Sequence, residues 1–253
     1  MSNKIAVVTG GSRGLGKNMA LSLAQKGIDV ILTYYSKKAE ADEVVRQIEG
    51  IGHKAYALQL DVSNSRAFAA FVQQVKDVLK EKWHRDSFDF LVNNAGNGIH
   101  ARFAETTEEE QFDQMMNTHL KGVLFLTQEL LPLIADKGRI INISSGLTRF
   151  ARPGCSACAT MKEAVETLTK YLAKELGARG IAINVAAPGA IETDFGGGVV
   201  RDNKKIDSFV AAKIALGRVG LPGGIGGVIA SLLSEDNRWV NAQRIEASGG
   251  MFT

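Results

Sequence analysis

Short runs of consecutive apolar residues alternate along this chain with longer segments in which apolar residues recur every three or four positions. The short runs are typical of buried strands, and they occupy residues 5–8, 30–34, 55–60, 88–92, 139–143, 182–185 and 243–246. Helical spacing fills the segments between them, for example at Phe68, Phe71, Val72, Val75, Val78 and Leu79. This alternation predicts an α/β fold with a doubly wound, mostly seven-stranded parallel sheet flanked by helices.

Composition agrees with one globular domain over residues 1–253, because α/β folds reach this length as single domains. Apolar residues make up 45% of the chain, and the net charge of +3 is scattered, so no nucleic-acid partner is indicated. The first residues lack the apolar core of a secretory signal, and no apolar run is long enough to span a membrane. Cys155 and Cys158 lie too close together for a long-range disulfide framework. We therefore expect a cytoplasmic protein with no membrane partner.

A glycine-rich turn follows the first apolar run. Residues 9–16 read Thr-Gly-Gly-Ser-Arg-Gly-Leu-Gly, and the helical pattern Leu15, Met19, Leu23 begins within them. Glycines permit a tight turn from strand to helix and let backbone N–H groups approach a pyrophosphate. The alternative is an ordinary glycine-rich loop. The order of strand, turn and helix favours the dinucleotide-binding turn of a Rossmann domain.

The end of the second predicted strand indicates which dinucleotide is bound. Residues 33–38 read Thr-Tyr-Tyr-Ser-Lys-Lys, without the carboxylate that would hold the ribose of NAD. A hydroxyl and two lysines stand there instead, and Arg13 lies inside the glycine turn. These groups favour the 2′-phosphate of NADP(H). The alternative is that Lys37 and Lys38 simply open a solvated helix.

Further motifs follow the later predicted strands in order: Asp61-Val62, Asn93-Asn94-Ala95-Gly96, Asn142-Ile143-Ser144-Ser145, and Pro188 through Thr193. With these motifs the chain resembles the short-chain dehydrogenase/reductase family over its whole length, including members that reduce 3-oxoacyl groups. The resemblance implies that Asp61 and Val62 bind the adenine, that residues 93–96 line the cofactor, and that residues 188–193 hold the nicotinamide. The candidate cofactor-binding residues are Gly10, Ser12, Arg13, Gly14, Leu15, Gly16, Tyr34, Tyr35, Ser36, Lys37, Asp61, Val62, Asn93, Ala95, Gly96, Lys162, Pro188, Gly189, Ile191 and Thr193.

The resemblance also implies a catalytic set: a Tyr that donates a proton to the carbonyl oxygen, a Ser that orients it, a Lys that lowers the Tyr pKa, and an Asn in a water-linked proton path. Ser145 and Lys162 occupy the matching Ser and Lys positions, but Cys158 stands where the Tyr is required. A thiol near a helix N-terminus and Lys162 is expected to be acidic enough. Its sulfur is only one bond beyond Cβ, so we expect a gap to the carbonyl. The chain is therefore expected to be a weakened NADPH-dependent reductase or, alternatively, an NADPH-binding protein without turnover.

His119 stands where the family usually has its Asn. It either serves the same proton path, because it donates and accepts hydrogen bonds, or is a buried histidine satisfied by backbone. The pair Cys155 and Cys158 also invites a redox or metal interpretation. Structural zinc requires four ligands, and with His119 the chain offers three, so no metal site is predicted.

Residues 189–215 have weak periodicity and three consecutive glycines at 196–198, which is typical of a mobile substrate-binding segment. Side chains expected to face the substrate are Ile99, His100, Phe103, Leu147, Phe150 and Phe195, and they indicate a mostly apolar small-molecule carbonyl substrate. Arginines 102, 149 and 152 either attract a negatively charged acyl carrier or are exposed, solubilising residues. Family resemblance further implies a homotetramer.

Two helix starts are also suggested. Thr107 and Glu110 have the spacing of a capping box. Pro222-Gly223-Gly224 opens another predicted helix, and we expect its first turn to fray because glycine is a poor helix former.

Overall fold

The computed structural model describes residues 3–103 and 108–253. Its seven strands form one parallel sheet in the order β3-β2-β1-β4-β5-β6-β7. The strands are β1 (Lys4–Val8), β2 (Ile28–Tyr34), β3 (Ala55–Gln59), β4 (Phe88–Asn93), β5 (Ile134–Ile143), β6 (Ala182–Pro188) and β7 (Arg244–Ala247). The predicted doubly wound parallel sheet is confirmed.

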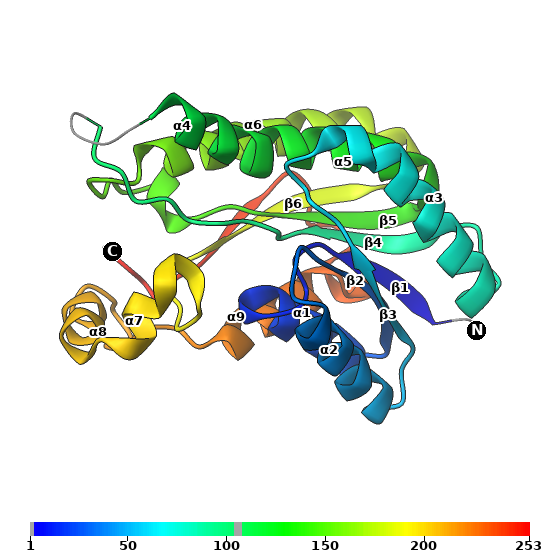
Figure 1. Cartoon of the computed structure of the whole chain (residues 1–253), viewed down its shortest axis with the longest axis horizontal. Helices are drawn as coiled ribbons and strands as arrows, with labels where there is room; N and C mark the ends of the chain where they lie inside the picture. Colours follow the sequence, from blue (N-terminus) through cyan, green and yellow to red (C-terminus); the bar gives the residue numbers. More distant parts are fainter. Residues whose placement is uncertain (1–2, 104–107) are drawn as a thin grey trace.

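Helices cover both faces of the sheet (Figure 1). The α-helices are α1 (Gly14–Ala24), α2 (Lys38–Gly50), α3 (Phe68–Val78), α4 (Glu109–Met116), α5 (Gly122–Leu130), α6 (Ser156–Glu175), α7 (Val199–Asp202), α8 (Lys204–Ala211) and α9 (Pro222–Leu232). Shorter turns are η1 (Ser65–Ala67), η4 (Leu131–Leu133), η5 (Gly146–Thr148), η6 (Gly177–Arg179), η7 (Phe195–Gly198) and η8 (Glu235–Asn237), with π-helical turns η2 (Leu79–Trp83) and η3 (Asn117–Lys121). In Figure 1, α1, α2 and α9 lie on one face and α3, α5 and α6 on the other, while α7 and α8 lie beyond the carboxyl ends of the strands.

Two cores explain why the central strands are apolar throughout. Along β1, Ala6 and Val8 belong to the core under α1, α2 and α9, whereas Ile5 and Val7 belong to the core under α3, α5 and α6. Successive side chains of a strand point to opposite faces, so a strand covered on both sides buries every residue. The continuous apolar runs in the sequence therefore reflect a sheet between two layers of helices.

Strand β5 starts earlier than its apolar run predicts. It begins at Ile134, opposite Phe88, but the next paired residue is Arg139, opposite Phe90, so residues 135–138 form an irregular bulge. Lys137 has a φ of +64° within this stretch. The regular pairing starts at Arg139, where the apolar pattern also starts.

Helix α9 begins at Pro222, as predicted, and packs along α1. Its glycines have different surroundings: a Cβ at Gly226 would lie 2.7 Å from the backbone oxygen of Asn18 in α1, whereas a Cβ at Gly223 or Gly224 would meet nothing within 4 Å among the described residues. Close approach of the two helices therefore requires glycine only at position 226. The proposed capping residue Thr107 lies outside the described residues, and α4 begins at Glu109.

Within the described part of the chain, no helix has the length and apolar character needed to cross a membrane.

Candidate active site

The motifs recognised in the sequence meet at the carboxyl edge of the sheet. The strand order reverses between β1 and β4, and ligands of doubly wound sheets bind outside the strand ends at such a reversal. The glycine turn follows β1, residues 94–96 follow β4, Ser145 follows β5 and residues 189–193 follow β6. Parallel pairing of β1, β4, β5 and β6 places these strand ends side by side.

The glycine turn has the backbone geometry that a pyrophosphate requires. Gly10 and Gly14 have φ values of +66° and +55°, which favour glycine, and a Cβ at Gly16 would overlap the backbone oxygen of Gly10. Helix α1 begins at Gly14 with no acidic residue in its first turn, and Arg13 before it is exposed. The positive end of this helix and its free N–H groups thus suit an anion.

Thr9 and Asn94 hold the glycine turn against the turn after β4. The Thr9 hydroxyl accepts hydrogen bonds from the backbone N–H groups of Asn94 and Ala95, at 2.9 and 3.0 Å. The Asn94 amide donates to the backbone oxygens of Thr9 and Gly10, at 2.9 and 3.2 Å. The sequence motifs included Thr9 and Asn94, but neither was predicted to join the two turns. Their signal was present as a hydroxyl at the end of β1 and a second amide beside Asn93.

The Asn93 side chain points into the protein. It is 4% exposed and donates to Thr127 Oγ1 at 2.9 Å and to Asn142 Oδ1 at 2.8 Å. Asn142 in turn donates to Thr169 Oγ1, so these amides join β4 and β5 to α5 and α6. Asn93 therefore orders the turn from inside, and its amide is committed to buried partners.

The end of β2 presents different groups to the glycine turn and to solvent. Gly10 N–H donates to Thr33 Oγ1 at 3.1 Å, which fixes this strand end beside the turn. Tyr34 is buried in the core, whereas Tyr35, Ser36 and Lys37 are exposed. The Lys38 ammonium forms an ion pair with the Asp42 carboxylate, at 2.7 Å. Thus Ser36 and Lys37 are the polar groups most available for a 2′-phosphate.

Near the adenine site implied by the resemblance, Asp61 Oδ1 accepts hydrogen bonds from the backbone N–H and hydroxyl of Ser63, at 2.9 and 2.7 Å. Val62 lies against the start of α5, where its backbone oxygen leaves no room for a Cβ at Gly122.

Ser145, Cys158 and Lys162 come from β5 and α6. Ser145 follows β5, and its Oγ accepts a hydrogen bond from Leu147 N–H at 3.2 Å. Lys162 is one helical turn after Cys158, and its Nζ donates to the backbone oxygen of Ile143 at 2.7 Å. Burial lowers the pKa of Lys162 to about 8, partly opposed by Cys158. The arrangement puts an ammonium that can lose its proton near neutral pH beside a thiol.

The acidity of Cys158 differs from the sequence expectation. Burial raises the pKa of this thiol, and although Lys162 acts in the opposite direction, its effect is the smaller of the two. Burial also raises the pKa of Cys155. The expected activation by the helix N-terminus and Lys162 is therefore overcome by desolvation. Both side chains are free thiols that stay protonated at neutral pH.

His119 lies in the π-helical turn η3 between α4 and α5 and is 1% exposed. Its Nε2 is 2.8 Å from the backbone oxygen of Asn97, which assigns the ring proton to Nε2. Nδ1 is buried and has no hydrogen-bond partner among the described residues. Burial, reinforced by Lys162, lowers the pKa of His119 to about 3. The ring is thus neutral. Its Nε2 donates to the Asn97 backbone oxygen, and its Nδ1 is a hydrogen-bond acceptor without a partner in the described part of the chain.

Residues 189–215 connect several parts of the site. Thr193 lies beside the glycine turn: a Cβ placed on Gly14 would be 3.8 Å from the Thr193 Cβ. The Thr193 hydroxyl accepts a hydrogen bond from the Phe195 N–H at 3.2 Å. The three glycines at 196–198 all have left-handed φ values. The Phe195 ring lies against Gly98, where a Cβ would be 2.9 Å from its Cε1. Phe195 therefore joins this segment to the loop after β4.

Other expected substrate-facing side chains have mixed placements. Phe103 is 85% exposed, Phe150 packs against Phe252, and the His100 ring lies against Gly154 just before α6. Arg149 is exposed, as one of its two expected alternatives has it, and its guanidinium pairs with Glu246 at 2.7 Å. Among residues 3–103 and 108–253, no three His, Cys, Asp or Glu residues are grouped so that they could hold a metal ion.

The fold and the glycine turn define a dinucleotide-binding α/β protein in which Ser145 and Lys162 lie at the same edge of the sheet as that turn. A family model described as enoyl-(acyl carrier protein) reductase matches residues 10–252. An uncharacterised oxidoreductase of Methylorubrum extorquens is 37% identical over 99% of this chain and 98% of its own length. The 3-oxoacyl-(acyl-carrier-protein) reductase FabG of Staphylococcus epidermidis is 34% identical over 99% of both chains. The chain belongs to the short-chain dehydrogenase/reductase family.

Solved structures agree with this assignment. The promiscuous reductase LugOII, which catalyses keto-reduction at C1 during lugdunomycin biosynthesis, superposes with a TM-score of 0.94 and 36% identity, over 100% of this chain and 99% of the other. The angucycline C-6 ketoreductase LanV with bound NADP gives a TM-score of 0.93 and 34% identity, over 98% and 95% of the two chains. The match extends over the whole fold in both cases.

Proposed function

We propose that the protein is an NADPH-dependent ketoreductase that transfers hydride to a ketone or 3-oxoacyl carbonyl. The observation that carries the proposal is that Ser145 and Lys162 lie at the carboxyl edge of the sheet, the edge that also carries the glycine turn: Ser145 follows β5, and Lys162 Nζ donates to the oxygen of Ile143 at the end of β5. The ketoreductase LanV binds NADP, and another similar structure, a blue fluorescent protein from a metagenomic library, is a complex with NADPH. The cofactor of this chain is NADP(H), which supplies the hydride when bound.

The residues described above suit this cofactor. The glycine turn holds the pyrophosphate, because its N–H groups and the positive end of α1 meet that charge, and exposed Arg13 supplies a guanidinium for the 2′-phosphate. Exposed Ser36 and Lys37 hold the 2′-phosphate, where a carboxylate would repel it. Residues 94–96 and 188–193 line the cofactor, and Asp61 and Val62 bind the adenine.

In the proposed reduction, Ser145 Oγ orients the carbonyl oxygen and the Cys158 thiol donates a proton to it. The raised thiol pKa keeps Cys158 protonated at neutral pH, as a donor must be. The Lys162 ammonium stabilises the thiolate that remains. His119 Nδ1, which has no partner among the described residues, accepts a hydrogen bond from a water in the proton path. The short reach of the thiol leaves a distance to the substrate, so turnover is weak.

The second candidate function is NADPH binding without turnover. Cys158 in place of Tyr is the observation that favours it. A redox role of Cys155 and Cys158 has less support, because the raised pKa of both thiols keeps the reactive thiolate scarce.

Residues 189–215 form the mobile segment over a mostly apolar carbonyl substrate. The exposed aromatic side chains Phe103 and Phe195, 85% and 58% exposed, support an apolar substrate. The landomycin C-6 ketoreductase LanV is a complex with NADP and rabelomycin, so rabelomycin is a first test compound.

A homotetramer and a cytoplasmic location remain part of this proposal. Phe125 on α5 and Tyr171 on α6 are 41% and 66% exposed, which suits packing against another copy.

The test begins with fluorescence titration by NADPH and NADH and continues with a ketone panel. We expect NADPH to bind and the wild type to reduce some ketones slowly. Cys158→Tyr should raise kcat by about 10²- to 10⁴-fold, because it restores a positioned general acid. Cys155→Ser is the matched control and should leave kcat unchanged. Equal rates for wild type and Cys158→Tyr would contradict the weakening by Cys158, and failure to bind NADPH would contradict the whole function.

A further inference from the structure

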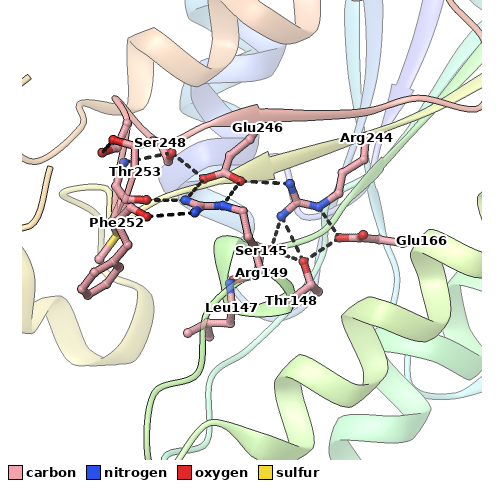
Figure 2. A network of polar contacts seen from close by, with 12 residues as sticks. Ser145, Leu147, Thr148, Arg149, Glu166, Arg244, Glu246, Ser248, Phe252 and Thr253 are labelled. Atoms are coloured by element: carbon pink, nitrogen blue, oxygen red, sulfur yellow. Dashed lines mark hydrogen bonds and ion pairs between the residues drawn. The ribbon is translucent and has the colours of Figure 1, made fainter. Parts of the chain in front are cut away.

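A row of alternating acidic and basic side chains crosses the structure beside Ser145 (Figure 2). Its members, which we call the ion-pair ladder, are in order Glu166, Arg244, Glu246 and Arg149. Arg244 lies 2.9 Å from a Glu166 oxygen and 3.0 Å from a Glu246 oxygen. Arg149 contacts both oxygens of Glu246 at 2.7 Å. The proposed reduction uses none of these four groups.

One end of the ladder fixes the loop that carries Ser145. Arg244 Nη2 donates to the backbone oxygen of Ser145 at 3.2 Å and to Thr148 Oγ1 at 3.0 Å. The Thr148 hydroxyl also lies 3.0 Å from the Ser145 oxygen. Glu166 accepts from the Ser144 hydroxyl at 2.6 Å. The Ser144 side chain and the Ser145 backbone oxygen are thus both tied to the ladder, and Figure 2 shows the contacts of Arg244 with Ser145 and Thr148.

The same end is attached to the helix that carries Lys162. Glu166 follows Lys162 by four residues, so the two side chains lie on one face of α6. Both are 7% exposed. The Glu166–Arg244 contact therefore joins the Ser145 loop to the Lys162 helix, and it affects how the two reactive groups stand relative to each other.

The other end of the ladder holds the C-terminal tail, residues 249–253. Arg149 donates to the backbone oxygens of Phe252, at 3.1 Å, and Met251. The Phe252 ring lies 4.7 Å from the Phe150 ring, between centroids. Phe252 has a φ of +53°, a conformation that a non-glycine residue keeps only where its surroundings hold it. The tail is therefore docked by specific contacts.

The docked tail in turn holds the end of the substrate segment. Phe252 N–H donates to the Lys213 oxygen at 2.9 Å. The N–H groups of Ala215 and Leu216 donate to the oxygens of Gly250 and Gly249, at 3.0 and 3.1 Å. Contacts thus run without a gap from residues 213–216 through the tail and the ladder to Ser145.

We propose that Arg244 is a positioning residue for Ser145, and that the C-terminal tail, docked through Arg149, keeps the ladder in this arrangement. Removing one member of a partly buried charged network leaves its partners unpaired, so the others rearrange. Misplacement of a substrate-orienting group by about 1 Å can lower a rate about 10²-fold. The kinetic part of the inference rests on the proposed keto-reduction, whereas its structural part does not.

The kinetic test compares Arg244→Gln with Arg85→Gln, in wild type and in Cys158→Tyr. Arg85 is a matched control because it pairs with the buried carboxylate of Asp89 at 2.8 Å. This pair lies near the amino end of β4, whereas Ser145 lies at the carboxyl ends of the strands. Arg244→Gln should lower kcat about 10- to 100-fold and leave the NADPH Kd within about 2-fold. Arg244→Lys should not restore kcat, because one ammonium cannot replace the guanidinium fork. Equal kcat for Arg244→Gln and Arg85→Gln would overturn the positioning role.

Hydrogen exchange tests the ladder without any turnover. In Arg149→Gln, amide protection should fall together in residues 144–148, 213–216 and 249–253, whereas Arg85→Gln should leave all three unchanged. Loss confined to 249–253 would overturn the link to Ser145. If the wild type reduces no ketone, the proposed function fails. Hydrogen exchange alone then tests whether the ion-pair ladder links the C-terminal tail to the Ser145 loop.

Discussion

The ring of His119 fills the space that the missing side chain of Gly96 leaves open. A Cβ at Gly96 would lie 2.6 Å from His119 Cε1. Gly96 belongs to the turn after β4, which is proposed to line the cofactor, and His119 belongs to the π-helical turn η3. The contact therefore links the turn after β4 to the neutral imidazole near Lys162.

Gly96→Ala should displace the His119 ring. Overpacking of this kind costs about 1–3 kcal/mol of unfolding free energy. Gly98→Ala is the control, because its Cβ would meet only the end of the Phe195 side chain, which can move. Urea unfolding and NADPH titration of the two variants measure the effect. Equal stability for both would show that the ring is not confined.

The stability of the protein should fall in acid because of His119. Its pKa is about 3 in the folded protein and near 6.5 when unfolded, so the unfolded state binds the extra proton between these values. Stability from this group is present above pH 6.5 and declines toward pH 3, with a slope of at most about 1.4 kcal/mol per pH unit. Urea unfolding between pH 4 and 7 should show a smaller slope for His119→Asn than for wild type. Identical slopes would contradict a buried neutral ring.

Reduction should become slower above about pH 8. Burial lowers the pKa of Lys162 to about 8, so its ammonium is present below this pH and is lost as the pH rises through it. In the proposed reduction the ammonium stabilises the thiolate formed at Cys158, and kcat/KM reports groups of the free enzyme. We expect kcat/KM to fall about tenfold per pH unit well above pH 8. A flat profile to pH 9.5 would contradict the role of Lys162.

Ser36→Asp should weaken NADPH binding. A carboxylate at this exposed position would face the 2′-phosphate, and a loss of about 1.4 kcal/mol corresponds to a tenfold rise in Kd. NADH carries no such phosphate and serves as the internal control, so its Kd should stay the same or fall. Fluorescence titration with both cofactors measures the ratio. Parallel weakening of both would place the 2′-phosphate elsewhere.

Gly226 and Gly224, both in α9, should respond oppositely to substitution by alanine. Gly226→Ala should destabilise the protein by about 1–3 kcal/mol, because the added methyl meets the Asn18 oxygen of α1. Gly224→Ala should stabilise it by up to about 1 kcal/mol, because alanine is the better helix former and the space there is open. Thermal unfolding distinguishes them. A stabilising Gly226→Ala would contradict the close approach of α1 and α9.

Much of the architecture was accessible from the chain itself. Apolar runs at 5–8, 30–34 and 88–92 predicted strands, and the glycine turn between the first strand and its helix predicted the cofactor edge. These signals are local: a strand buried on both faces needs consecutive apolar residues, and a turn with positive φ favours glycine. Resemblance to the short-chain dehydrogenase/reductase family also identified Ser145 and Lys162, which stand at the matching Ser and Lys positions.

Tertiary packing decided the properties of those residues. Whether Cys158 becomes more or less acidic depends on how deeply α6 buries it, and desolvation raised its pKa against the nearby Lys162. Arg149 pairs with Glu246, 97 positions later in the chain, and the buried Asn93 amide donates a hydrogen bond to Asn142. The sequence by itself therefore determined the fold, the turn and the order of the motifs. Burial and long-range partners arise only when distant elements pack together, so the structure alone decided which groups are charged, free or held in place.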